Sequence, residues 1–578
     1  MPNQVTKSLS GNIQVLSANG LSTFVDDSDG LLKIKDTNGV VQPITEYTGG
    51  GGIIVQGTGT CSSVRCGVNN NALGTYSAVL GGQNNCALAN YNFLGSGCAN
   101  TISGSYSQGG VINGGFGNCI NAVYSATIGG GASNCIYGGD YFNTIGGGVS
   151  NTINNSTGSS GSTTIGGGQG NLASGYWITI GGGRLNTASG YKSGIFGGQS
   201  NTSSGDTSMI LGGQINLNSG YLATIGGGRL NCATNDGVTI VGGFGNKGLG
   251  AYSSISGGIS NCAIGACSSI GGGQTNTILS TGTRAVIAGG QNNCSNANVS
   301  SVGGGSFNTI TSSGNYSTLA GGSNNTVSNY SSTIGGGYGN SVTGSNSIIA
   351  GGKSNCTTGS RAFIGGGECN FSSGNYSSMG GGCLNKSIGA FSGVMSGFTN
   401  CATGIYSFVG GGDLNTASGC RSAILAGNAN TAAGNPAFIG GGFNNVASAP
   451  YASIMGGGNN TASGNNAFIG AGFLNNVSAF SSMVGSGCQS TASACYSSVV
   501  GGALNTASGA YSAVLGGKSN IASCAYSAVY GCGITSSMAC AFHTNRIVVT
   551  QLPSASAGLP SGAMWYDPAD GNRVKYIP

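Results

Sequence analysis

The chain of 578 residues is rich in glycine and very poor in charge, with 118 Gly, 8 Pro and 5% charged residues. This bias is unlike that of an ordinary globular enzyme, and without a Gly-X-Y period it is not that of collagen. The net charge of +5 is spread thinly and forms no basic run, so we expect no nucleic-acid binding.

Residues 1–75 differ in composition from the rest and are expected to form a small β module. The segment 30–39 alternates Leu32 and Ile34 with Lys33 and Lys35 and ends in Asn-Gly. This pattern is typical of a strand that leads into a hairpin turn. We expect this module to attach the chain to other proteins of its assembly.

Residues 76–541 repeat one pattern, in which an apolar anchor is followed by Gly-Gly, by Asn and by a Ser-Gly turn. A fixed short period indicates a repeat architecture of about 30 turns. From residue 319 onward the anchors recur every 15 residues, at Leu319, Ile334, Ile349, Ile364, Met379, Val394, Val409, Ile424, Ile439, Ile454, Ile469, Val484, Val499, Val514 and Val529. The earlier anchors have less regular spacing and are Val79, Leu94, Ile112, Ile128, Ile145, Ile165, Ile180, Ile195, Ile210, Ile225, Ile240, Ile255, Ile270, Ile287 and Val302.

Two positions of the repeat predict its turn chemistry. Gly occupies the third place after the anchor (position +3) except at Cys532, and it allows a positive φ and close backbone approach. Asn occupies position +6 except at Ser490 and Thr535; it tolerates left-handed geometry and can form a stacked amide ladder. The predicted ladder includes Asn340, Asn355, Asn370, Asn385, Asn400, Asn415, Asn430, Asn445, Asn460 and Asn475.

The length of one repeat suits two short strands and two turns, which predicts an all-β, flattened parallel β-roll (a β-solenoid). Residues directly before and after the anchors, such as Phe438 and Leu425, are apolar or small, so both faces of the anchor strand suit burial. A thin roll buries about one aliphatic side chain per turn, worth roughly 1.5–3 kcal/mol. The second apolar face should therefore be covered by other copies of the chain, which predicts a homo-oligomer.

Many of the cysteines also follow the repeat, at position +7, where Thr is the commonest alternative. A position that accepts Cys or Thr favours a small, partly buried side chain, so we expect free packing thiols. Cys119 and Cys135 alone share this position in consecutive turns, within disulfide range, and their oxidation state stays open. No CxxC occurs, so we expect no zinc site.

Residues 542–578 lose the period and are expected to form a C-terminal cap module. The segment 563–571 followed by 573–577 predicts a hairpin around Asp570-Gly571. This module concentrates aromatic and polar residues that could bind a host glycan or protein receptor. The candidates are His543, Trp565, Tyr566 and Tyr576; covering the last turn is an equally good role for Trp565.

The repeat S-x-I-x-G-G-x-x-N-x-A-S-G-x-Y, with Val in the Ile place at Ser497–Tyr511 and Ser512–Tyr526, resembles the head repeats of YadA-like trimeric adhesins. It also resembles repeats in tail fibres of bacteriophages and other large DNA viruses. The resemblance implies a left-handed parallel β-roll, three of which pack side by side. The segments 30–41 and 547–567 resemble short end modules of viral fibre proteins.

The sequence offers little for catalysis or cofactor binding, since His543 is its one histidine and the carboxylates of the repeats are scattered. We therefore expect no enzyme and no cofactor. We see no signal peptide and no membrane helix, and expect synthesis in the host cytoplasm without membrane insertion. The leading hypothesis is a trimeric virion fibre, a surface appendage of the particle that adheres to the host. The alternatives are a bacterial adhesin head lacking its anchor, and an ice-binding β-solenoid, whose flat Thr face the mixed Thr and Cys positions disfavour.

Overall fold

The computed structural model describes residues 54–65, 67–104, 109–122, 124–138, 141–155, 161–547, 552–567 and 573–577, with five short strands between residues 5 and 43. These residues form two compact units, 1–322 and 323–578. The described part of the chain is all β and contains no helix. It confirms the predicted parallel β-solenoid, with about 31 turns and a period of about 15 residues.

The first five strands form an antiparallel sheet in the order of the sequence. They are β1 (Val5–Lys7), β2 (Ile13–Leu16), β3 (Ser22–Val25), β4 (Leu32–Lys35) and β5 (Val41–Pro43). Strand β4 pairs with β5 through Lys35 and Val41, so the predicted strand and hairpin partner are confirmed. The Asn-Gly turn between them lies outside the described residues.

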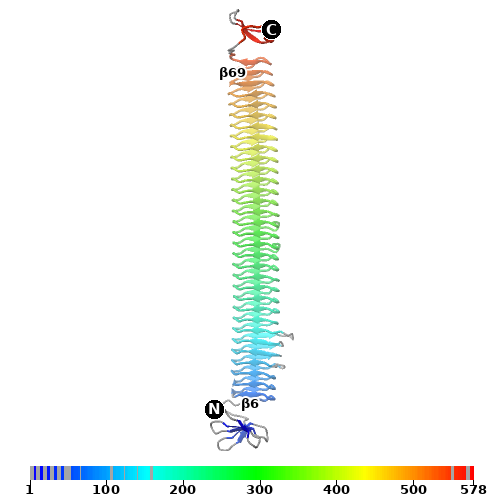
Figure 1. Cartoon of the computed structure of the whole chain (residues 1–578), viewed down its shortest axis with the longest axis vertical. Coiled ribbons are helices and arrows are strands. Elements are labelled where there is room, and N and C mark those ends of the chain that lie inside the picture. Colours follow the sequence, from blue (N-terminus) through cyan, green and yellow to red (C-terminus); the bar gives the residue numbers. More distant parts are fainter. Residues whose placement is uncertain are drawn as a thin grey trace. The chain divides into compact units, whose positions relative to one another are not determined.

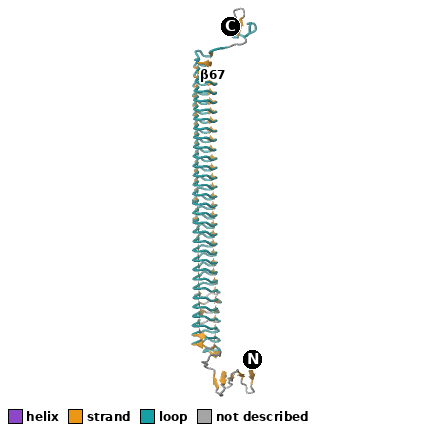
Figure 2. Cartoon of the chain, turned by 90° about the vertical axis from the view of Figure 1, so that its left-hand side faces the viewer, coloured by secondary structure: helices purple, strands orange, loops and turns teal. Residues whose placement is uncertain are grey.

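One solenoid turn contains two short strands joined by two loops, as the alternation of strand and loop in Figure 2 shows. In a representative turn the anchor strand is β53 (Phe408–Val409) and the second strand is β54 (Thr416–Ala417). β53 pairs in parallel with β55 (Ala423–Ile424), and β54 pairs with β56 (Thr431–Ala432). Within each unit, successive turns stack in the order of the sequence (Figure 1).

The core of each turn lies between its two strands. Val409 and Ala417 point inward from the two strands and are fully buried, together with the polar side chains of Asn415 and Ser422. Each buried anchor contributes roughly 1.5–3 kcal/mol, and the alanine at position +8 adds a second, smaller apolar contact. The interior is therefore a thin core of one aliphatic side chain, one methyl group and two polar groups per turn.

Left-handed backbone geometry occurs in most turns at two places besides position +3, at positions +5 and −3. In the representative turn they are Leu414, with φ 56°, and Arg421, with φ 57°. The sequence-based prediction placed this geometry at the asparagine of position +6, and that was wrong, because the strained residue is the one before it. The neighbouring hydrogen bonds hold Leu414 in a conformation that costs a non-glycine residue about 1–2 kcal/mol.

The solenoid starts one turn earlier than the periodicity indicated. Strand β7 (Ser63–Arg65) pairs in parallel with β10 (Ala78–Val79), which places Val64 in the anchor position. Strand β6 (Ile54–Gln56) runs antiparallel along the other edge of β7. Gly67 and Asn70 follow Val64 at positions +3 and +6, so the repeat was already present in the sequence.

The last solenoid strands are β67 (Ala513–Lys518), β69 (Ala528–Cys532) and β70 (Phe542–Thr544). β70 pairs in parallel with β69, and His543 stands opposite the anchor Val529. Beyond it, β71 (Met564–Asp567) and β72 (Arg573–Tyr576) form an antiparallel pair. This confirms the predicted hairpin, although its turn lies outside the described residues.

Candidate functional site

The predicted asparagine residues of unit 2 are buried, and each connects three turns. The Asn415 N–H donates to Asn400 Oδ1 at 3.0 Å, and the Asn430 N–H donates to Asn415 Oδ1 at 3.0 Å. The Asn415 side-chain amide donates to the carbonyls of Gly411 at 3.0 Å and Gly427 at 2.7 Å. The column is therefore held mainly by bonds between amide and backbone. The other nine predicted members, Asn340, Asn355, Asn370, Asn385, Asn400, Asn430, Asn445, Asn460 and Asn475, are buried in the same way.

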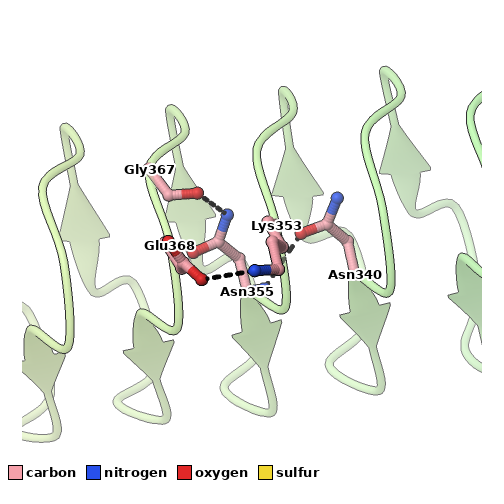
Figure 3. A network of polar contacts seen from close by, with 5 residues as sticks. All are labelled: Asn340, Lys353, Asn355, Gly367 and Glu368. Atoms are coloured by element: carbon pink, nitrogen blue, oxygen red, sulfur yellow. Dashed lines mark hydrogen bonds and ion pairs between the residues drawn. The ribbon is translucent and has the colours of Figure 1, made fainter.

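Figure 3 shows this arrangement around Asn355, which forms the same hydrogen bonds with its neighbouring turns. Its N–H donates to Asn340 Oδ1 at 2.9 Å and its side-chain amide donates to the Gly367 carbonyl at 2.9 Å. On the outside of the same loops, Lys353 Nζ lies 2.7 Å from Glu368 Oε1. Both ends of this ion pair are about half exposed, so it contributes little to stability.

The residues directly before and after each anchor, positions −1 and +1, form an outward surface that we call the outer anchor face. These side chains point away from the core of their own chain because successive strand residues alternate in direction. Leu425 and Met395 are each 50% exposed, and Val241 is 60% exposed. Apolar side chains exposed in row after row of a monomer are characteristic of a surface that another molecule covers.

A stack of aromatic rings lies on the loop that leads into the anchor strand, at position −3. The rings of Tyr376, Phe391 and Tyr406 are parallel, with centroids 4.8 and 4.9 Å apart. Arg361 lies 5.0 Å above the Tyr376 ring at one end, and Arg421 lies 6.0 Å from the Tyr406 ring at the other. The sequence interpretation missed this stack, although aromatic residues spaced by one period were its signal.

Among the predicted receptor-binding residues, the structure describes the side chains of His543, Trp565 and Tyr576, and it shows no contact between any two of these three. His543 belongs to β70, where its Nε2 lies 3.1 Å from the Met538 carbonyl oxygen. Trp565 stands opposite Lys575 in the hairpin, and the Lys575 amino group lies 5.8 Å from its ring centroid. Strand alternation places Tyr576 on the opposite hairpin face from Trp565, and the side chain of Tyr566 lies outside the described residues. Tyr576 is 72% exposed.

Two thiols and a phenol, those of Cys119, Cys135 and Tyr137, lie on neighbouring strands and shift one another's pKa. Cys119 on β16 (Cys119–Ala122) stands opposite Cys135 on β18 (Cys135–Gly138), in the same strand as Tyr137. A hydrogen bond from Cys119 and one from Tyr137 lower the pKa of Cys135 to about 6. The hydrogen bond between Tyr137 and Cys135 raises the pKa of Tyr137 to about 12. The hydrogen bond between Cys119 and Cys135 raises the pKa of Cys119, and burial raises it further. Both cysteines are free and half-buried.

The remaining cysteines at position +7 are also free and half-buried. Burial raises the pKa of the Cys294 and Cys356 thiols, which suits a packing role. Within the described ranges, no group of three or more His, Cys, Asp or Glu side chains could hold a metal ion. None of the described segments forms a helix long and apolar enough to cross a membrane.

No protein-family model matches the chain, and no curated protein matches it. Function must therefore be inferred from the repeat, the fold and the exposed surfaces.

Proposed function

We propose that this chain is the structural subunit of a trimeric virion fibre, in which three copies lie side by side and the fibre adheres to the host surface. The proposal makes the chain a scaffold and a binding protein, with no catalytic step and no cofactor. The resemblance of its repeat to YadA-like heads and to viral tail fibres supports this function, and so does the β-solenoid that the chain forms.

One observation carries the trimer part of the proposal: the outer anchor face exposes apolar side chains that the chain itself does not cover. Phe363 is 40% exposed and Leu211 is 52% exposed, although both flank fully buried anchors. Burying such side chains yields about 25 cal/mol per Å² of apolar surface. Three copies that cover this face for one another gain that energy in every turn where such a residue occurs.

The test of this function is the mass of the purified chain in native buffer. A trimer has three times the chain mass of 56.0 kDa, and sedimentation or native mass spectrometry resolves it from the single chain. We expect a stable trimer at micromolar concentration. A stable monomer would contradict the proposal.

In the assembled fibre we propose that residues 1–75 bind other virion proteins and that the C-terminal module, 542–578, faces the host receptor, a glycan or a protein. The exposed Tyr576 and the cation above Trp565 suit this role. An antibody against residues 552–577 should label the distal tip of the fibre in electron micrographs of the particle. Labelling at the particle surface would show that the fibre is attached by its C-terminal end, opposite to the proposed orientation.

Two alternatives remain testable in the same way. A bacterial adhesin head would be found on a cell surface instead of a virion. An ice-binding solenoid needs a regular Thr face, and the pairing at position +7 sets Thr101 beside Cys119, Leu217 beside Cys232, and Phe371 beside Lys386. We therefore expect no thermal hysteresis from the purified chain.

A further inference from the structure

We propose that the outer anchor face between residues 393 and 530 is the surface through which copies of this chain bind one another. The inference rests on the proposed trimer and names its interface. Over this stretch every turn carries one large apolar side chain on the face, and no turn carries two. They are Met395, Phe408, Leu425, Phe438, Met455, Phe468, Met483, Val500, Leu515 and Tyr530.

The large side chains alternate between the two outward positions over most of the stretch. Phe408 at position −1 is paired with Gly410 at +1, and in the next turn Ala423 at −1 is paired with Leu425 at +1. The same exchange continues through Phe438, Met455 and Phe468. Each turn therefore offers one large and one small residue, and their order is reversed in the next turn.

Two of the aromatic rings lie against glycines of the sheet. A Cβ built on Gly470 would lie 3.6 Å from Phe468 Cε1, and one built on Gly393 would lie 3.4 Å from Phe408 Cδ2. The rings therefore cover the neighbouring glycines and stay half-buried, while Leu425 and Val500 are 50% and 51% exposed.

This surface has the composition and the area of a stable interface. Positions −1 and +1 from Gly393 to Tyr530 contain only apolar side chains, Gly, Ala and Ser, and charge is depleted at the centre of protein interfaces. Seven of the ten side chains are 37% to 54% exposed and the three Phe rings are less exposed. Together they present on the order of 800 Å² of apolar surface, about what each partner buries in a standard interface.

The repeat of the surface identifies a second copy as its occupant. Its rows recur with the strand spacing of ~4.8 Å, and a globular partner has no surface that repeats at this spacing over so many turns. Another copy of the same chain does. Copies related by rotation about an axis along the stacking direction place each turn beside the same turn of the neighbour, an arrangement that closes as a cyclic oligomer.

Methionine oxidation tests the interface in the unaltered protein. Hydrogen peroxide converts accessible methionine to its sulfoxide, and peptide mass spectrometry gives the rate at each residue. In the single chain Met395, Met455 and Met564 are 50%, 44% and 48% exposed, and Met379 is fully buried. Met564 in the C-terminal hairpin is thus the matched exposed control, and Met379 is the buried reference.

If copies bind through this face, Met395 and Met455 should oxidise several-fold more slowly than Met564 and approach the rate of Met379. Met395 and Met455 oxidising as fast as Met564 in a protein of trimer mass would show that the oligomer forms through another surface. A protein of monomer mass would instead contradict the proposed function itself. Low concentrations that dissociate the trimer should restore rapid oxidation of Met395 and Met455 alone.

Discussion

The outer anchor face is built differently in two stretches of the chain, 127–181 and 393–530. In the first stretch each turn pairs a threonine at position −1 with a glycine at +1, as in Thr144 and Gly146. In the second, each turn has one large apolar residue on the same face. The inner wall is alike in both, because anchors such as Ile145 and Ile439 are fully buried. The inner wall, which the fold requires, is therefore constant, whereas the outer face, which we propose for association, varies along the chain.

The largest effect is expected from charges on the apolar stretch. The double substitution Phe438→Asp with Phe468→Asp places two carboxylates on the proposed interface of every copy. Each unpaired buried charge costs several kcal/mol. We expect the oligomer to dissociate or aggregate, as measured by sedimentation.

The matched control is Thr164→Asp with Thr179→Asp, at the same position −1 in the first stretch. This variant should keep the mass of the unaltered protein. Equal loss of association in both variants would remove the distinction between the two stretches.

The second effect concerns the turn that follows the anchor strand and should be the same in both units. Gly457 has φ +89°, and a Cβ there would lie 2.0 Å from the Gly472 carbonyl oxygen. Gly457→Ala should therefore lower the free energy of unfolding by about 3 kcal/mol or more, from strain and overpacking together. Gly183→Ala, at φ +92° and 2.2 Å from the Gly198 carbonyl, should cost as much.

Gly456 provides the control for this prediction, since a Cβ there would have no atom within 4 Å. Gly456→Ala should change the free energy of unfolding by less than about 0.5 kcal/mol. Thermal or denaturant melting that ranks Gly456→Ala with Gly457→Ala would show that the close approach at position +3 does not limit the turn.

A smaller effect is expected in the asparagine column. Asn415→Leu removes two side-chain donors and the acceptor of the Asn430 N–H, at a cost of about 1–3 kcal/mol. Ser490 stands in this column where other turns have Asn. Its hydroxyl lies 3.5 Å from the carbonyl oxygen of Cys488, in its own turn. Among the described hydrogen bonds, the Asn505 N–H has no acceptor in the column.

Ser490→Asn should complete the column and raise the free energy of unfolding by about 1 kcal/mol. Unchanged melting for both Asn415→Leu and Ser490→Asn would mean that the column contributes nothing to stability.

The smallest effect is chemical and concerns the paired thiols near the first stretch. Because the thiolate is the nucleophile, alkylation of Cys135 by iodoacetamide should rise as the pH passes through about 6 and level off near neutrality. Burial raises the pKa of Cys401, so its alkylation should keep rising well above neutral pH. Mass spectrometry of the labelled peptides measures both, and Tyr137→Phe should move the Cys135 profile to higher pH.

The period and the two near-constant positions were sufficient to predict the solenoid, because Gly at +3 and Asn at +6 each have a fixed structural task. The left-handed residues could not be predicted in the same way. Leu414 and Arg421 stand at positions that accept almost any residue, since hydrogen bonds to neighbouring turns impose the geometry whatever the side chain. The anchor-like role of His543 was hidden by a turn that is one residue shorter than the period.

The surface was harder to predict than the core. The large residues flanking the anchors were visible in the sequence, but their exposure and the contact of Phe468 with Gly470 needed coordinates. In the C-terminal hairpin, strand alternation alone places the receptor candidates Trp565 and Tyr576 on opposite faces. Closeness of aromatic residues in a sequence is therefore weak evidence of a shared site.

The antiparallel strand β6 has a consequence for how large an assembly can become. A parallel solenoid exposes a free strand edge at its first turn, and a second solenoid could add there and continue the ladder without limit. Residues Ile54–Gln56 occupy that edge of β7 and run in the reverse direction. The first anchor strand therefore offers no free edge to a second solenoid, and the number of repeats in the sequence sets the number of turns.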